Sequence, residues 1–198
     1  LERLRMPKYT YEIPAGFLLL HNLTTNAGSF DYIKIVVGCK SKASATNGAV
    51  AGVISQTMAS KDMLKPVKTL YIKSKEASKA FRKTKGKPLV FEFQGSNKSK
   101  LLNHEGVKVP FSWTPGDKEE PTVDVDNLFP DPDINEPRKF VRMPLYAVKN
   151  ITKILDALNV QEINFLFCDQ GEPAVSHYVK DCMYGGELQL SFVTAMTS

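Results

Sequence analysis

The sequence has few of the residues on which the commonest metal and disulfide sites depend. It contains three cysteines and three histidines, and neither type shows a metal-ligand spacing. The cysteines, Cys39, Cys168 and Cys182, are odd in number and widely separated, which argues against a disulfide framework. We expect each to be a small apolar residue in or beside a strand. Neither a metal site nor a disulfide-stapled fold is predicted.

Short catalytic and nucleotide-binding motifs are also missing. There is no G-x-S-x-G elbow, no G-x-x-x-x-G-K-[ST] phosphate loop and no G-x-G-x-x-G after a strand. The pair Gly86 and Lys87 lacks the upstream glycine and precedes Pro88, so it is not a phosphate loop. No residue is a catalytic candidate. The sequence therefore predicts a non-enzyme that needs no cofactor.

Long apolar runs are missing as well. No run approaches the roughly 20 residues that a membrane helix needs, and residues 17–20 are typical of the short runs present. The first residues do not resemble a signal peptide, so we expect an intracellular protein without a membrane partner. Residues 1–5 precede a plausible start at Met6, and we expect them to be a remnant of cloning or processing. With 42% hydrophobic and 24% charged residues, the composition is that of a globular protein.

Charge is distributed unevenly along the chain. The overall +5 divides into +12 over residues 1–116, −7 over residues 117–137 and zero over residues 138–198. The acidic stretch also carries four prolines, which forbid a regular helix and predict an extended linker. A basic region of this kind favours a polyanionic partner.

Hydrophobic periodicity predicts strands and one helix in the first part of the chain. A helix is expected after Pro14, over residues 15–26, and a turn or hairpin loop over residues 41–48. Residues 89–93 and 107–113 should form a strand pair. Strands are further expected at residues 8–13, 32–37, 49–57 and 67–72.

The last third repeats this order more clearly. A strand over 139–143 precedes a helix over 145–158, whose apolar stripe is Val148, Ile151, Leu155 and Leu158. Further strands are expected at 162–168, 174–179 and 187–194.

The predicted fold class is α+β, with two β-α-β-β-β half-repeats packed as one domain with antiparallel sheets and two main helices. The first half would span residues 6–116 with a charged insertion at 73–87. The linker would span 117–137 and the second half 138–198.

The final stretch resembles the last half-domain of the sliding clamp family, the processivity rings of DNA replication and their checkpoint relatives. The resemblance lies in a strand and a helix, then Ile163-Asn-Phe-Leu-Phe-Cys-Asp-Gln-Gly-Glu-Pro-Ala-Val175, and a closing strand ending in Thr194-Ala195. It covers residues 138–198. It implies pseudo-twofold half-domains, helices that line the inner wall of a ring, and subunits that join at sheet edges. It also implies partners: double-stranded DNA, replication or repair proteins, and further copies of the chain in a homo-oligomer.

The strongest basic signal is residues 73–87, with seven basic residues and one acidic residue. If this segment is helical from about Lys75, its cations share one face while Ala77, Ala80 and Phe81 form the packing side. A solvated surface face is the alternative. The predicted nucleic-acid-binding residues are Lys75, Lys79, Arg82, Lys83, Lys85, Lys87, Lys149 and Lys153.

Other polar positions are expected to contribute less to nucleic-acid binding. The exposed positions of the first helix are expected to be His21, Asn22, Thr24 and Thr25, which carry no fixed charge. Mobile contacts are expected from lysines in predicted loops, namely Lys40, Lys42, Lys98 and Lys100.

The favoured function is a sliding-clamp-like, sequence-independent DNA-binding protein that tethers replication or repair proteins, found with DNA or in a nucleus. The alternative is a viral protein that coats single-stranded DNA or RNA, stacking bases on exposed aromatic side chains. Core packing is the favoured use of those aromatics, which are Phe91, Phe93, Phe111 and Trp113. A third class is a structural or virion assembly protein. One hypothesis for the acidic linker is that it mimics phosphates and lies on the basic region.

Overall fold

The structure is a computed structural model and describes residues 7–38, 40–56, 65–94, 98–113, 145–160, 164–166, 174–181 and 188–194. Its elements follow in chain order. They are β1 (Tyr9–Ile13), the 3₁₀ helix η1 (Ala15–Leu20), α1 (His21–Thr24), η2 (Gly28–Phe30), β2 (Tyr32–Val37), β3 (Lys42–Thr46), β4 (Val50–Gln56), β5 (Lys68–Lys73), α2 (Ser74–Thr84), β6 (Leu89–Phe93), β7 (Lys100–Leu102), β8 (Ser112–Trp113), α3 (Leu145–Ala157), β9 (Asn164–Leu166), β10 (Ala174–Asp181) and β11 (Leu188–Thr194).

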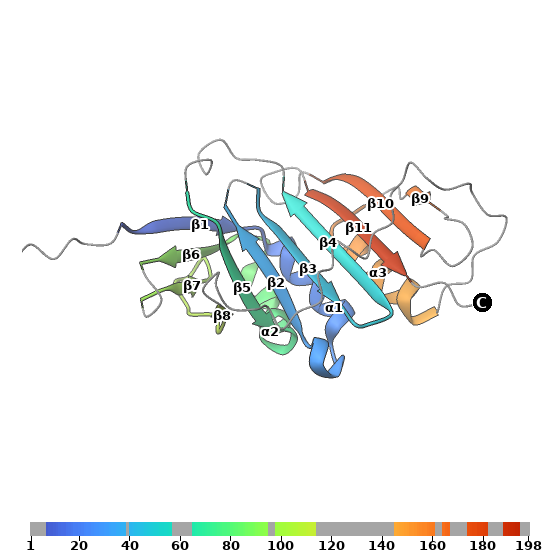
Figure 1. Cartoon of the computed structure of the whole chain (residues 1–198), viewed down its shortest axis with the longest axis horizontal. Coiled ribbons are helices and arrows are strands. Elements are labelled where there is room, and N and C mark those ends of the chain that lie inside the picture. The colour runs from blue at the N-terminus through green and yellow to red at the C-terminus, as the bar shows by residue number, and fades with distance from the viewer. Residues whose placement is uncertain are drawn as a thin grey trace, which may run out of the picture.

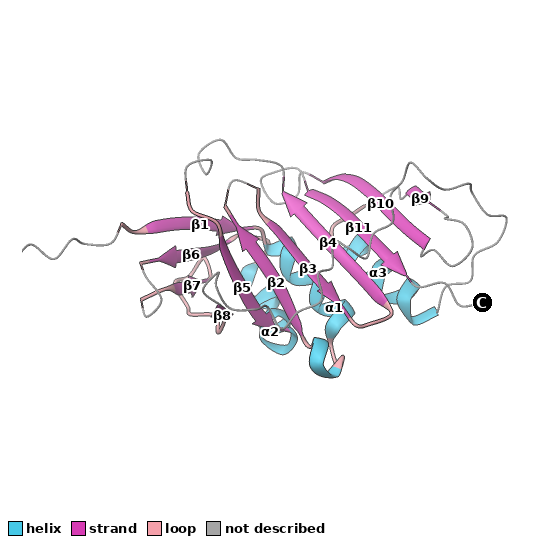
Figure 2. Ribbon diagram, viewed as in Figure 1, coloured by secondary structure: helices cyan, strands magenta, loops and turns pink. Residues whose placement is uncertain are grey.

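The strands form two antiparallel sheets. One has eight strands in the order β8-β5-β2-β3-β4-β11-β10-β9, and the other has three in the order β1-β6-β7. The helices lie together on one face of the large sheet, behind it in the view of Figure 1 and cyan in Figure 2. The predicted mixed α/β class with antiparallel sheets is therefore confirmed.

A strand–helix–strand–strand–strand order occurs twice within residues 9–113. The first unit runs from β1 to β4 and the second from β5 to β8. The leading strands are exchanged, since β1 pairs with β6 of the second unit and β5 pairs with β2 of the first. The region that was expected to form one half thus holds two complete units, and α3 with β9–β11 follows as part of a third.

Residues 73–87, expected as a charged insertion, contain the last residue of β5 and all of α2. They therefore occupy the helix position of the second unit. Their apolar signal is weak because only small side chains, Ala77 and Ala80, are buried along this helix besides Ser74 and Thr84. The acidic linker over 117–137, the strand over 139–143, residues 1–5 and all three cysteines lie outside the described residues.

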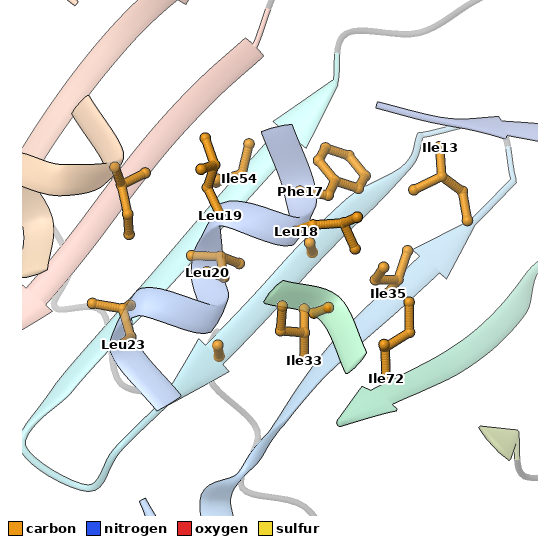
Figure 3. Packing of buried hydrophobic residues seen from close by; sticks show 14 of the residues in the cluster. Ile13, Phe17, Leu18, Leu19, Leu20, Leu23, Ile33, Ile35, Ile54 and Ile72 are labelled. Carbon is orange, nitrogen blue, oxygen red and sulfur yellow. The ribbon is translucent and has the colours of Figure 1, made fainter. Parts of the chain in front are cut away.

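The helix expected over residues 15–26 is instead η1 followed by the four-residue α1. All six residues of η1 are buried because it lies between the large sheet and the other helices. Figure 3 shows Leu18 near Ile35 of β2, while Leu23 lies at the opposite end of the group. A segment that is apolar on every side has no helical periodicity to read, which is why the sequence did not distinguish 3₁₀ from α geometry.

The loop expected over residues 41–48 is wrong, because the structure forms β3 there, between β2 and β4. Its side chains are small, and Ala43 and Ala45 are buried where η1 and α1 cover the sheet. Small residues in a central strand allow that close approach, although they carry weak strand propensity. The turn that follows is closed by Asn47, whose Oδ1 accepts hydrogen bonds from the backbone of Ala49 and Val50 at 2.9 and 2.8 Å.

The strand pair expected from residues 89–93 and 107–113 is also corrected. β6 pairs with β1 and β7, while β8 pairs with β5 of the large sheet. Residues 107–113 contribute only one isolated bridge to β7, between Lys108 and Leu102. The Asn103 side chain turns the chain after β7 by accepting hydrogen bonds from the backbone of Glu105 and Val107.

The third unit joins the first through β11 and β4, where Phe192 stands opposite Gly52. A Cβ atom at Gly52 would lie 2.8 Å from Leu23 Cδ1 and 2.9 Å from Phe192 Cδ1. Glycine is therefore required here by close packing. This contact fixes α1 and the third unit against one sheet, and so sets where α3 lies relative to α1.

Candidate nucleic-acid interface

Helix α2 has the predicted packing side, but its cations do not share a single face, since Arg82 lines one groove and Lys79 and Lys83 line another. Ala77 and Ala80 are buried and Phe81 packs against the core. Its cations Lys75, Lys79, Arg82 and Lys83 are all exposed. Lys85 ends the helix in the left-handed conformation, with φ 50°, and the exposed Lys87 follows.

Two of the predicted cations on or after α2 are paired with carboxylates. Lys79 Nζ lies 3.1 Å from Glu76 Oε1, and Lys85 Nζ lies 3.8 Å from Glu105 Oε1. Exposed pairs of this kind contribute little stability and exchange readily for a phosphate. The other predicted cations form no ion pair with an acidic group in the described ranges. These cations are Lys75, Arg82, Lys83, Lys87, Lys149 and Lys153.

Helix α3 is amphipathic, and its buried stripe matches the predicted one except at Val148. Ala147, Ile151 and Ile154 are buried along it, whereas Val148 is 39% exposed. Of the predicted stripe, Ile151 and Leu158 are buried and Leu155 is packed against the core, so only Val148 is wrong. Packing against α1 and η1 buries the small Ala147 in place of Val148. Lys149 and Lys153 are exposed, as expected.

The three helices meet at a groove of about 310 Å³. Arg82 of α2 and Lys153 of α3 both line it, so the structure brings together two predicted cations that are distant in sequence. Helix α1 adds His21 and Asn22 to the lining. Sequence reasoning placed these two residues on an exposed face but assigned them no role, because only the packing of the helices shows that they share a groove with cations.

His21 is held in one orientation at this groove. Its Nδ1 lies 2.7 Å from the backbone oxygen of Leu18, and since a carbonyl only accepts, Nδ1 carries the proton. Burial lowers the pKa of the His21 imidazole below its ordinary value; the hydrogen bond to Leu18 opposes this, and the charge of Arg82 lowers the pKa further. In the free protein the lowered pKa therefore favours the neutral form of the His21 ring.

The other predicted exposed positions of the first helix divide. Thr25 is exposed, whereas Thr24 is fully buried, which corrects that expectation. The Thr24 hydroxyl forms a buried hydrogen bond with the hydroxyl of Ser74 at the start of α2. This contact ties α1 to α2.

Lys79 and Lys83 lie on the other side of α2, along a smaller depression of about 90 Å³ that Lys108 also lines. The loop lysines divide as well, since Lys42 lies in β3 and Lys100 in β7. The predicted basic residues thus form two groups on either side of α2, with Arg82 and Lys153 in one and Lys79 and Lys83 in the other.

The aromatic residues with described side chains belong to the core. Phe91 is buried, and its ring contacts Tyr11 and Phe111 at centroid distances of 5.9 and 5.6 Å. Phe93 and Phe111 are partly buried against the same cluster. The favoured prediction, core packing, is confirmed for these three. The side chain of Trp113 lies outside the described residues.

The described residues show neither a metal-binding cluster nor a membrane-spanning helix. These residues contain no cluster of three or more His, Cys, Asp or Glu side chains that could hold a metal ion. Among the helices of the same part of the chain, none is long and apolar enough to cross a membrane.

The exchanged strands, the continuous antiparallel sheet and the helix layer on one face define the class of fold: it is that of the DNA sliding clamps, as the sequence resemblance predicted. The likeness extends over nearly the whole chain, beyond residues 138–198. No protein-family model and no curated protein sequence matches the chain.

The structural relatives include bacterial clamps. The DNA polymerase sliding clamp of Pseudomonas aeruginosa matches with a TM-score of 0.58 and 11% identity, over 96% of this chain and 66% of its own. The DNA polymerase III beta subunit of Thermotoga maritima gives a TM-score of 0.58 and 11% identity, over 96% and 65%. The Helicobacter pylori beta clamp, bound to a DNA ligase peptide, gives 0.55 and 12%, over 96% and 67%. The chain therefore spans about two thirds of the length of these clamps.

Proposed function

We propose that this protein is a sliding-clamp-like tether that binds duplex DNA without reading its sequence and carries out no catalysis itself. The observation that carries the proposal is the helix layer. It covers one face of a sheet with the clamp fold and presents six cations that have no acidic partner in the described part of the chain. Lysine and arginine contacts to phosphates give affinity that is sequence-independent and sensitive to salt, which sliding requires.

The partners follow from the same proposal. Double-stranded DNA would lie along the face formed by α1, α2 and α3, and replication or repair proteins would bind elsewhere on the surface. The Helicobacter pylori clamp binds a DNA ligase peptide, which supports this second class of partner. The protein would be found with DNA, in a nucleus or in virus-infected cells.

Encirclement of DNA would need more than one copy of the described fold. Within the described residues, the large sheet ends at β8 on one side and β9 on the other. Sheet edges of this kind can pair with another subunit, so we propose a homo-oligomer joined edge to edge.

The single-strand-binding alternative loses support at its proposed stacking platform. Phe91 is buried, and Phe93 and Phe111 are partly buried against the core, so these rings pack in the core. The cations of α2 remain available to either nucleic acid. Comparison of duplex with single-stranded DNA therefore separates the two functions.

The experiment measures binding of a labelled duplex at low salt by fluorescence anisotropy. Lys75 and Lys83, both exposed and without an acidic partner in the described residues, are changed together to Glu. The matched control changes Lys40 and Lys98, which are exposed and outside the helices, to Glu. The dissociation constant should rise by about tenfold or more for K75E/K83E, and clearly less for the control. If both variants lose the same affinity, the loss is explained by the change in net charge, and the helix face is not the DNA-binding surface.

A further inference from the structure

The groove between α1, α2 and α3 differs from the rest of the basic surface because it combines cations from two helices with a titratable ring from a third. Arg82 and Lys153 supply the cations, and His21 and Asn22 supply hydrogen-bonding groups. Among the described residues, no acidic side chain lines it. We infer that this groove is a seat for a single backbone phosphate of bound duplex DNA, held by Arg82, Lys153 and His21. The inference rests on the proposed function and assigns one site within that surface.

The two fixed cations suit this ligand. Both are exposed, and neither is paired with an acidic group in the described ranges, so no carboxylate of those ranges has to be displaced. The planar guanidinium of Arg82 can donate two parallel hydrogen bonds to a phosphate, while the Lys153 ammonium acts as a point charge. Because the two residues come from different helices, a ligand that touches both must sit at the helix junction.

His21 adds a feature that lysine and arginine lack. With its Nδ1 proton directed to the Leu18 carbonyl, a neutral ring leaves Nε2 as an acceptor, which cannot bind a phosphate oxygen. A protonated ring offers Nε2–H as a donor and adds a positive charge. Phosphate binding and protonation of His21 therefore favour each other.

The sign of this coupling follows from the groups around the ring. The charged groups that line the groove with His21 are Arg82 from α2 and Lys153 from α3. The charge of Arg82 lowers the pKa of the His21 ring in the free protein. A bound phosphate offsets the charge of these cations and pairs with the imidazolium, which raises the His21 pKa. The complex therefore takes up a proton, and duplex affinity rises as the pH falls through the histidine range.

The test follows duplex affinity between about pH 5.5 and about pH 7.5, on either side of the ordinary histidine pKa. His21→Asn places an amide N–H near the position of Nδ1, so the hydrogen bond to Leu18 is kept while the titration is removed. His104→Gln is the matched control, because His104 lies in the turn after β7, outside the groove. Wild type and H104Q should bind more tightly as the pH falls, by up to about tenfold per pH unit for one proton. H21N should lose that part of the dependence.

A second measurement makes the two proposals separable. The His21 ring is followed by NMR as inorganic phosphate is added, and its pKa should rise in wild type and not in Arg82→Met. If H21N keeps the full pH dependence while K75E/K83E still weakens duplex binding, the seat is overturned and the DNA function stands. If phosphate raises the His21 pKa but no duplex binds at any pH, the groove binds phosphate, but the DNA function and the assignment of the seat to duplex DNA both fail.

Discussion

Replacement of Gly52 by alanine tests the junction on which the whole helix layer depends. The added Cβ would lie 2.8 Å from Leu23 Cδ1, 2.9 Å from Phe192 Cδ1 and 3.0 Å from Phe192 Cε1. Optimal carbon–carbon contacts are about 3.5–4.0 Å, so the side chains of Leu23 and Phe192 must both move. Overpacking of this kind costs about 1–3 kcal/mol, which corresponds to about 2–4 °C in Tm per kcal/mol for a chain of this size.

The assay is urea unfolding of wild type, G52A, Leu23→Ala and the double variant, followed by far-UV circular dichroism. Because L23A removes the Cδ1 atom that the new Cβ meets, G52A should cost less in the L23A background, by about 0.5 kcal/mol or more. Two results would refute the reasoning. One is G52A as stable as wild type, and the other is strict additivity of the two changes, which would mean that Leu23 does not press on this strand.

Two further predictions concern the helix contacts and the acidic segment. Thr24→Val should lower the free energy of unfolding by about 1–3 kcal/mol, because it leaves the buried Ser74 hydroxyl without a partner, and adding Ser74→Ala should recover part of the loss. A T24V variant with unchanged urea unfolding would show that this hydroxyl pair is not formed. Changing the eight acidic residues of 117–137 to amides should tighten duplex binding and steepen its salt dependence if the segment competes with DNA for the basic face. Unchanged affinity in the same anisotropy titration would discard that hypothesis.

Much of the fold could be predicted because its signals are local. The packing side of α2 follows from the helical spacing of its alanines and lysines, and the structure places Ala77 inside and Lys75 outside as that spacing requires. The predicted bounds of β2, β4 and β5 agree with the structure to within a residue or two at the described ends of the strands. These strands could be predicted because they are rich in β-branched residues.

What could not be predicted depends on neighbours distant in the chain. β3 consists of small and polar residues that form a strand only because β2 and β4 flank it and helices cover it closely. The first position of the buried stripe on α3 was ambiguous because Val148 and Ala147 are both apolar, and only packing against α1 decides between them. For the same reason the groove that joins His21, Arg82 and Lys153 could not be read from the sequence, since each residue comes from a different helix.

The salt dependence of duplex binding by the unmodified protein tests the central claim most directly. Six cations of α2, α3 and the turn after α2 have no acidic partner within the described residues. If all six contact phosphates, the logarithm of the association constant should fall against the logarithm of the salt concentration with a slope of about −5. Two duplexes of unrelated sequence should give the same slope and affinity. A slope near zero, or no binding at low salt, would contradict the assignment of a DNA-binding helix layer.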